Sequence, residues 1–257
     1  MGIMRNGLLA LGEKTRRLIF FLREYFFPAD CALCGAALIT IQEAWYGLCE
    51  SCRNTIEDQW AEDRLSANSF CDLCGRPLVS ERERCLPCRN AEKPAFDRAA
   101  VFFPYTGKYR RLLNAYKFGK NLALGNFFAE KIQDALANAL AFEYVSPETV
   151  IVPVPPRPGK IRKTGWDQVE YLVTLLEKGG IKVSRCLKRL PSKIQKALNR
   201  AERKTNLRGR IILKGAPPQT VILIDDVMTT GSTLDVCAAV LKKGGTKKVY
   251  GICLFYD

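Results

Sequence analysis

The feature that most constrains the fold of this chain is the stretch 221–234, which reads VILIDDVMTTGSTL. Its first four residues are apolar without polar alternation, which is typical of a strand covered on both faces in a parallel α/β sheet. Two acids follow, then small hydroxyl-bearing residues. A segment with apolar residues at helix spacing comes next, at Leu234, Cys237, Ala238 and Leu241. The order of strand, acid pair, small loop and helix predicts a ligand site at the carboxyl end of a sheet strand.

The residue types of this stretch indicate which ligand to expect. Amides at the start of a helix hold an anion, and Thr and Ser hydroxyls add donors. Ionised carboxylates accept hydrogen bonds from a sugar diol. A phosphorylated ribose satisfies both groups, whose members are Asp225, Asp226, Thr229, Thr230, Gly231, Ser232 and Thr233.

The same stretch is also compatible with structures that bind no phosphorylated ribose. A buried strand leading into an Asp-capped turn would need no ligand, because Asp and Thr are ordinary turn residues. Neither G-x-x-x-x-G-K-[ST] nor G-x-G-x-x-G occurs in the chain, which disfavours a nucleotide-hydrolysing motor. The ordered set closely resembles the phosphoribosyl pyrophosphate (PRPP) motif of type I phosphoribosyltransferases. That resemblance implies that Asp225 and Asp226 face the ribose hydroxyls, that residues 229–233 wrap the 5′-phosphate, and that Mg²⁺ accompanies PRPP.

Eight of the eleven cysteines form four C-x-x-C pairs, a strong signal for two closed four-thiolate zinc sites of structural type. Taken in order, the pairs give one site from Cys31, Cys34, Cys49 and Cys52, and another from Cys71, Cys74, Cys85 and Cys88. A cross-braced pairing stays open at this point. Redox C-x-x-C chemistry and iron–sulfur ligation rank below zinc. The other three cysteines, Cys186, Cys237 and Cys253, lie in apolar surroundings and are expected in the core.

The charge and the absence of histidine narrow the function classes. The formal net charge is +14, and residues 157–210 hold 16 Lys and Arg against 4 Asp and Glu. Such a concentration suits a polyanion, either a pyrophosphate-bearing ligand or nucleic acid, although a solvated basic surface is the alternative. With no histidine in the chain, Ser-His and Cys-His nucleophilic sites are excluded.

The first part of the chain indicates where the protein works. Residues 1–27 contain only short apolar runs, the longest being 18–22, so we expect neither a signal peptide nor a transmembrane segment. An amphipathic helix packed on the protein body is expected there, with membrane-surface attachment as a weaker option. Together with the cysteine usage, this predicts that the protein is located in the reducing cytoplasm. Residues 53–70 join the two cysteine groups, with Ile56, Trp60 and Leu65 as expected packing points.

The order of motifs along the whole chain resembles the ComF family of phosphoribosyltransferase-like proteins. After the C-x-x-C-G double ribbon come Y-x-G-x-x-R (Tyr105, Gly107, Arg110), K-F-G (117–119), P-V-P (153–155), G-W-D-Q (165–168), a Q…R…N connector and D-D-V-x-T-T-G-S-T (225–233). The family often has R-G-F-N-Q where this chain has Thr164-Gly165-Trp166-Asp167-Gln168, so Arg is replaced by Thr and Asn by Asp. The added negative charge lies near the expected pyrophosphate site and weighs against turnover more than against the fold.

The resemblance implies a type I phosphoribosyltransferase-like α/β domain with an N-terminal double zinc ribbon. The expected parts are an N-terminal helix at 1–27, the ribbons at 28–92 and the α/β domain at 93–257. One hypothesis is a phosphoribosyl-transferring enzyme, for which no catalytic acid or base can be named. The other is a non-catalytic uptake factor that binds single-stranded DNA through residues 157–210 and exposed aromatic residues such as Trp166. The family's association with competence adds DNA uptake and a helicase partner to these expectations.

Overall fold

The computed structural model describes residues 29–67, 69–137, 148–191 and 209–257. The predicted helix at 1–27 therefore lies outside the described residues, as does most of the polar connector, including Gln195, Arg200, Arg203 and Asn206. The elements of the cysteine-rich part are α3 (Ile41–Tyr46), α4 (Glu50–Leu65), β1 (Ser69–Phe70), β2 (Pro77–Leu78) and α5 (Leu86–Arg89). Those of the remainder are β3 (Arg98–Pro104), α6 (Gly107–Lys117), α7 (Leu124–Ala137), β4 (Val150–Pro153), α8 (Lys160–Thr164), α9 (Gln168–Lys178), β5 (Leu187–Arg189), β6 (Ile211–Leu213), β7 (Thr220–Met228), α11 (Ser232–Lys243) and β8 (Lys248–Tyr256).

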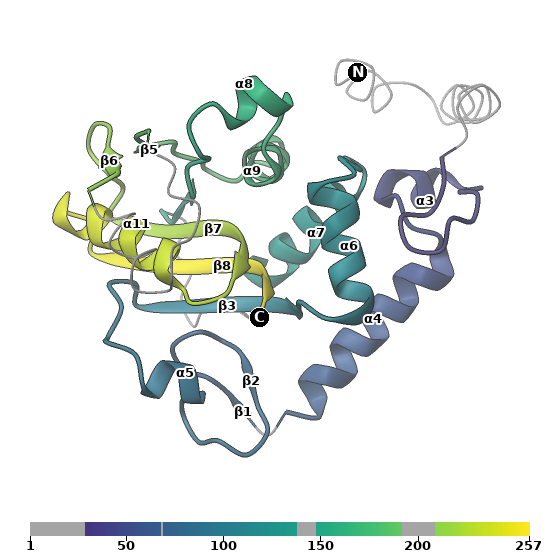
Figure 1. The fold of residues 1–257 in the computed structure, drawn as a ribbon, viewed down its shortest axis with the longest axis horizontal. Helices are drawn as coiled ribbons and strands as arrows, with labels where there is room; N and C mark the ends of the chain where they lie inside the picture. Colours follow the sequence, from purple (N-terminus) through teal and green to yellow (C-terminus); the bar gives the residue numbers. More distant parts are fainter. Residues whose placement is uncertain (1–28, 68, 138–147, 192–208) are drawn as a thin grey trace.

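The centre of the molecule is a four-stranded sheet in the order β3-β8-β7-β4 (Figure 1). All three strand pairs are parallel, with Ile222 of β7 opposite Tyr250 of β8 and Ile151 of β4. Parallel strands are joined by crossover helices, and these cover both faces of the sheet. The predicted α/β class and the buried strand at 221–224 are confirmed, but β7 continues through both acids to Met228.

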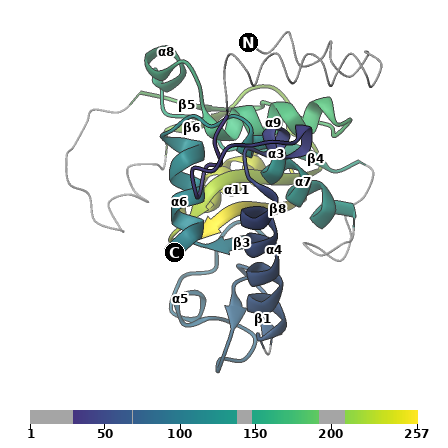
Figure 2. The ribbon, with the colours of Figure 1, turned by 90° about the vertical axis from the view of Figure 1, so that its right-hand side faces the viewer.

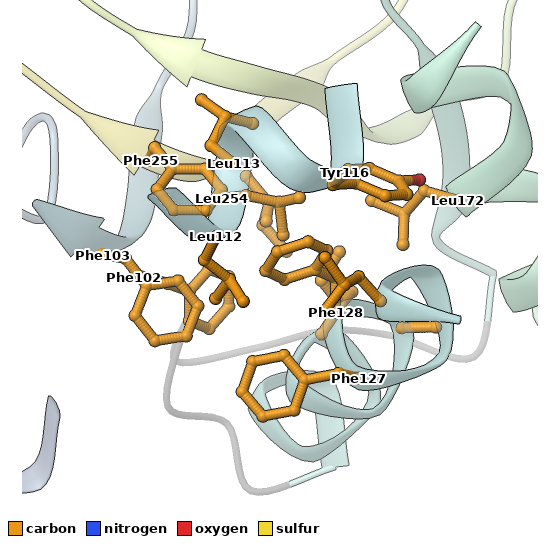
Figure 3. Close-up of a cluster of buried hydrophobic side chains, with 14 of the residues drawn as sticks. Phe102, Phe103, Leu112, Leu113, Tyr116, Phe127, Phe128, Leu172, Leu254 and Phe255 are labelled. Atoms are coloured by element: carbon orange, nitrogen blue, oxygen red, sulfur yellow. The ribbon is translucent and has the colours of Figure 1, made fainter. Parts of the chain in front are cut away.

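Successive residues of a strand point to opposite faces of the sheet, and here they enter two separate cores. Ile222 and Ile224 belong to the core under α6, α7 and α9, whereas Val221 and Leu223 belong to the core under α11. The first core is rich in aromatic rings from β3, α6 and α7 (Figure 3). Among them, Phe103 stacks on Tyr109 at 5.2 Å between ring centroids. The second core contains Cys186, Cys237 and Cys253, as the sequence predicts.

The cysteine-rich part consists of two modules at different places on the sheet domain, joined by α4 (Figures 1 and 2). We call residues 29–52 the first ribbon and residues 69–90 the second ribbon. The first ribbon lies beside α7, where the Asn126 side-chain amide donates to the Trp45 carbonyl at 2.7 Å. The second ribbon lies against the edge strand β3, where the Ala99 amide donates to the Leu73 carbonyl at 2.7 Å. Covering an edge strand in this way removes unpaired backbone groups from solvent.

Some elements differ from the sequence-based expectation. The basic connector at 186–213 contributes two short antiparallel strands, β5 and β6, at its described ends. Of the three packing points expected on α4, Ile56 is fully buried and the Trp60 indole donates to the Phe102 carbonyl at 2.9 Å, but Leu65 is 85% exposed. No helix within the described ranges is both long and apolar enough to cross a membrane.

Candidate functional site

The eight paired cysteines gather into two clusters of four. Within each cluster the sulfur atoms all lie within 4.8 Å of one another. The clusters consist of Cys31, Cys34, Cys49 and Cys52 in the first ribbon, and of Cys71, Cys74, Cys85 and Cys88 in the second. The structure therefore pairs the C-x-x-C motifs in sequence order and excludes the cross-braced alternative.

The spacing of the sulfur atoms fits a four-thiolate metal site. Cys34 Sγ and Cys49 Sγ lie 3.7 Å apart, and so do Cys74 Sγ and Cys85 Sγ. Four sulfurs placed tetrahedrally at a zinc–sulfur distance of about 2.3 Å are separated by about 3.8 Å. A disulfide would need about 2.0 Å, and all eight cysteines are free thiols. The donor set and its dimensions are consistent with two structural zinc sites.

The two ribbons build their clusters from the same local parts. In each, a knuckle closes with the amide of a left-handed glycine donating to the first cysteine's carbonyl, from Gly35 to Cys31 at 3.0 Å and from Gly75 to Cys71 at 2.8 Å. The other two ligands of each cluster come from the first turn of a helix, for which Cys49 and Cys85 are the N-caps. Helix N-terminal amides favour a thiolate, which is the form that binds a metal.

A second group of polar residues converges on Asp226 from three distant segments. The Lys117 ammonium at the end of α6 lies 2.6 Å from Asp226 Oδ2, and the Gln168 side-chain amide at the start of α9 donates to the same oxygen at 2.6 Å. Gln168 is held in turn by the Tyr116 hydroxyl, which donates to its backbone carbonyl at 2.7 Å. The K-F-G and G-W-D-Q motifs thus meet the acid pair in the folded chain.

The two acids have different surroundings because adjacent residues of β7 point to opposite faces. Burial alone would raise the pKa of Asp226, but the charge of Lys117 and the hydrogen bonds that Asp226 accepts lower it below the ordinary value. Asp225 points toward the α11 side and is somewhat more exposed than Asp226. Burial and the neighbouring charge of Asp226 raise the pKa of Asp225 well above its ordinary value. The pair therefore favours one ionised and one protonated carboxyl group.

The small-residue loop follows β7 directly and leads into α11. Gly231 is the N-cap of α11 in the left-handed region at φ 69°, and a Cβ on it would lie only 3.0 Å from Met228 Cε. The Thr230 and Ser232 hydroxyls are 2.7 Å apart and hydrogen-bonded to each other. Thr229 and Thr230 are exposed, so backbone and hydroxyl groups of the loop are accessible to a ligand.

The departure from the R-G-F-N-Q pattern has a local structural explanation. Asp167 is the N-cap of α9 and accepts bonds from the Val169 and Glu170 amides, both at 3.0 Å. Its other oxygen pairs with Lys160 at 2.6 Å, so its charge is compensated by a residue of α8. Trp166 is half-buried and packs edge-on against Tyr116 at 5.4 Å between ring centroids, so it is not the exposed platform that the sequence suggested.

Two residues of this site were not among the candidates drawn from the acid motif. Lys117 and Gln168 stand in motifs of the chain, but nothing local to either residue indicates that it contacts Asp226. Their arrangement depends on how α6 and α9 pack over one face of the sheet. Among the described residues, the geometry identifies no catalytic acid or base.

Comparisons with known proteins agree with this architecture. A double zinc ribbon domain family matches residues 22–89. The chain is 25% identical over 231 residues to Competence protein F of Haemophilus influenzae, covering 87% of this chain and 95% of the relative. It is also 25% identical to the ComFC competence protein of Bacillus subtilis over 253 residues, covering 95% of this chain and 97% of the relative. Competence protein ComFC of Streptococcus pneumoniae matches with the same identity, over 85% of this chain and 96% of the relative.

The fold and the two cysteine clusters define an α/β protein that carries a double zinc ribbon. The matches extend over nearly the full length of the relatives, so they include the sheet domain as well as the ribbons. Over nearly its whole length this chain resembles the ComF/ComFC competence proteins, and its N-terminal part matches the double zinc ribbon domain family.

Proposed function

We propose that this protein binds PRPP with Mg²⁺ at the carboxyl end of β7, between the acid pair and the loop 229–233. The observation that carries the proposal is the convergence of Lys117, Gln168 and Asp226 beside that loop, because three distant segments place charged and amide groups at one strand end. Ligand sites of parallel α/β sheets occupy this position.

The residues take distinct roles in this proposal. The backbone amides and side-chain hydroxyls of residues 229–233 donate hydrogen bonds to the 5′-phosphate. Asp225 and Asp226 accept hydrogen bonds from the ribose hydroxyls, and Asp225 is the more accessible of the two. Lys117 and Gln168 hold the Asp226 carboxylate in position. Arg157 is exposed beyond the end of β4 and is available to the pyrophosphate.

Phosphoribosyl transfer is the reaction class that such a site would support. In that reaction positive charge would develop at the anomeric carbon as pyrophosphate departed, and Mg²⁺ bound with PRPP would supply charge neutralisation for the pyrophosphate. The task of the chain is then positioning and electrostatic stabilisation, for which carboxylates beside the ribose are suited. The acceptor of the phosphoribosyl group stays unassigned.

The test is calorimetric titration of PRPP into protein with a full zinc complement, with and without Mg²⁺. We expect binding that requires Mg²⁺ and is lost in an Asp225→Asn/Asp226→Asn variant. Asp72→Asn, an exposed acid of the second ribbon, is the control and should bind as the wild type does. Absence of heat and of a thermal shift at millimolar PRPP in the wild type would refute the proposal.

A second candidate function, binding of single-stranded DNA, is supported by the exposed surface at α8. Arg162 and Lys163 are exposed there, and Phe118, 71% exposed, follows the α6 end in a loop whose Lys120 ammonium donates to the Thr164 carbonyl. Cations beside an exposed aromatic ring suit an unpaired strand. The relatives named as competence proteins favour a role in DNA uptake, for which a cytoplasmic location and a helicase partner are further proposals. Binding that weakens steeply with salt and is unchanged in the Asp225→Asn/Asp226→Asn variant would favour this function over PRPP binding.

A further inference from the structure

A cavity of about 570 Å³ lies between the loop after β7 and the second ribbon. One wall is formed by Thr229, Thr230, Gly231 and Ser232 of the loop. The opposite wall includes three of the cluster cysteines, Cys74, Cys85 and Cys88, together with Leu86 of α5. This volume is in the range of small-molecule sites.

The lining of the cavity combines hydroxyl groups, apolar side chains and charged groups of both signs, the acids being Glu92 and Asp235. The loop supplies hydroxyl groups and a glycine without a side chain, while Leu73, Phe96 and Met228 supply apolar surface. Arg76 contributes a cation at the border of the cavity. A phosphorylated small molecule with an apolar or sugar portion matches this distribution, because phosphate takes the donors and the remainder covers the apolar wall.

Two connections link the second ribbon to the elements at the two ends of the loop, one through the segment that follows the ribbon and one through Arg76. On one side, the Ala95 amide donates to Asp235 Oδ1 of α11 at 2.8 Å. On the other, the Asp257 amide donates to the Met228 carbonyl at 3.2 Å, and the Arg76 guanidinium donates to the Asp257 carbonyl. The end of β7, where the loop begins, is therefore linked to the second ribbon through Asp257 and Arg76.

The first ribbon has no comparable relation to the loop. Its contacts with the sheet domain include the edge-on packing of Tyr46 on Phe127 of α7 at 6.4 Å between ring centroids, and none of residues 29–52 lines this cavity. The two cysteine clusters thus differ in their relation to the proposed ligand site, although their local construction is the same.

We propose that the second ribbon is a wall of the ligand site, so that PRPP binding at the loop and metal binding at the second cluster stabilise each other. The first cluster is not coupled in this way. The inference rests on the proposed PRPP function and adds its regulation: the affinity for the phosphorylated ligand depends on whether the second cluster holds its metal. Such coupling is reciprocal, so the ligand must also retain the metal.

The assignment of the cavity as the ligand site is tested by a substitution in the second ribbon that places a larger side chain in the cavity. Leu86 is 59% exposed and lines the cavity, so Leu86→Trp should reduce PRPP affinity about tenfold or more while zinc stays at about two per chain. Val79→Trp places the same ring on the same ribbon at a side chain that is 76% exposed and outside the cavity, and should leave the affinity unchanged. Equal affinity in the wild type and in Leu86→Trp would overturn the assignment of this wall.

The coupling is tested by the rate at which a chromophoric chelator removes zinc, with and without Mg²⁺ and PRPP. Cys52→Ser keeps only the second cluster intact, and its zinc release should slow when the ligand is added. Cys88→Ser keeps only the first cluster, and its zinc release should not change. The proposed coupling would be overturned if the ligand changed the rate of zinc release in neither variant, or changed it equally in both.

The outcomes separate this inference from the proposed function. If the wild type binds no PRPP, the proposed function fails and the inference fails with it. If the wild type binds PRPP and neither Leu86→Trp nor the zinc release responds, the inference alone fails and the PRPP site stands.

Discussion

The two ribbons of this protein share one local construction and contact different surfaces. Each has a knuckle with a left-handed glycine and a helix that begins at a cysteine. The first ribbon adds its buried residues to the core under α6, α7 and α9, whereas the second adds its residues to the core under α11. The two adjacent acids also lie on opposite faces of the sheet. Asp226 faces the side of the core under α6, α7 and α9, and Asp225 faces the side of the core under α11. The two ribbons thus share one kind of ligand set and one local construction, and differ in the surface that each contacts.

The largest expected effect is the loss of one zinc ion together with local unfolding of the ribbon that held it. Cys52→Ser and Cys88→Ser should each retain about one zinc per chain instead of about two. Structural zinc contributes an apparent free energy of about 10–16 kcal/mol in small metal modules, so the affected ribbon should unfold locally. Hydrogen exchange should rise in residues 29–52 and α7 for Cys52→Ser, and in residues 69–90 and β3 for Cys88→Ser. Increased exchange in the same segments for both variants would contradict the separation of the two surfaces.

The next-largest effect is on the free energy of unfolding, for which we compare an ion pair on one face of the sheet with an ion pair on the other face. Lys117→Met leaves Asp226 buried without its cation and should lower the free energy of unfolding by about 3 kcal/mol. Lys242→Met removes a more exposed pair, with Asp97 at 2.8 Å, and should cost about 1 kcal/mol or less. Urea denaturation measures both values.

The pH dependence of the Lys117 variant has a defined sign. In the wild type the pKa of Asp226 is lowered, so the ionised form stabilises the fold above the ordinary Asp range, and this contribution is lost as pH falls through the lowered pKa. Without Lys117 that contribution is absent, so the difference between wild type and variant should be large at pH 7 and shrink toward pH 3. A difference that is independent of pH would show that Asp226 is not the group involved.

A smaller effect compares the two knuckle glycines. Both have positive φ, so alanine at either position costs about 1 kcal/mol in backbone strain. A Cβ on Gly35 meets nothing within 4 Å, whereas one on Gly75 would lie 2.7 Å from the Ala99 carbonyl oxygen of β3. Gly75→Ala should therefore cost about 3 kcal/mol in total, measured by thermal or urea unfolding of the zinc-loaded protein. Equal losses for the two variants would mean that the second ribbon does not rest on β3.

The smallest effect concerns the proton on Asp225. Its raised pKa means that folding is favoured with the neutral form, a contribution lost as pH rises through that pKa. A ligand that binds the ionised form must release the proton, so PRPP affinity should rise with pH by up to about tenfold per unit below the raised pKa. Calorimetry in buffers of different ionisation enthalpy should detect proton release, and Asp225→Asn should abolish any buffer dependence of residual binding. Binding heat independent of buffer in the wild type would oppose this role for Asp225.

The sequence predicts most of the sheet because its signals are local. The apolar run at 221–224 and the terminal strand follow from residue type, and the C-x-x-C spacing identifies the eight ligands of the two clusters taken together. Leu65 was expected to pack and does not, because it lies nine residues after Ile56. At 3.6 residues per turn it therefore points about 180° away from the buried face of α4.

The rest of the site depends on packing between distant segments. The contacts of Lys117 and Gln168 with Asp226 join residues that lie about 60 or more positions apart in the chain, and no periodicity encodes them. The same holds for the cavity, whose walls come from the second ribbon and the loop after β7. The pairing of the four cysteine motifs could likewise not be decided from spacing, since both arrangements use the same eight residues.

The position of β8 has a consequence for how the chain folds during synthesis. β8 lies between β3 and β7 in the sheet, yet it follows all the other described strands along the chain. β3 therefore has no strand neighbour until residues 248–256 have been translated, whereas each ribbon draws its four ligands from about twenty consecutive residues. Short-range contacts form sooner than long-range strand pairing. A ribosome-bound chain should thus carry two folded metal modules while β3 still lacks β8, and the second module would cover only the edge of β3 that faces away from β8.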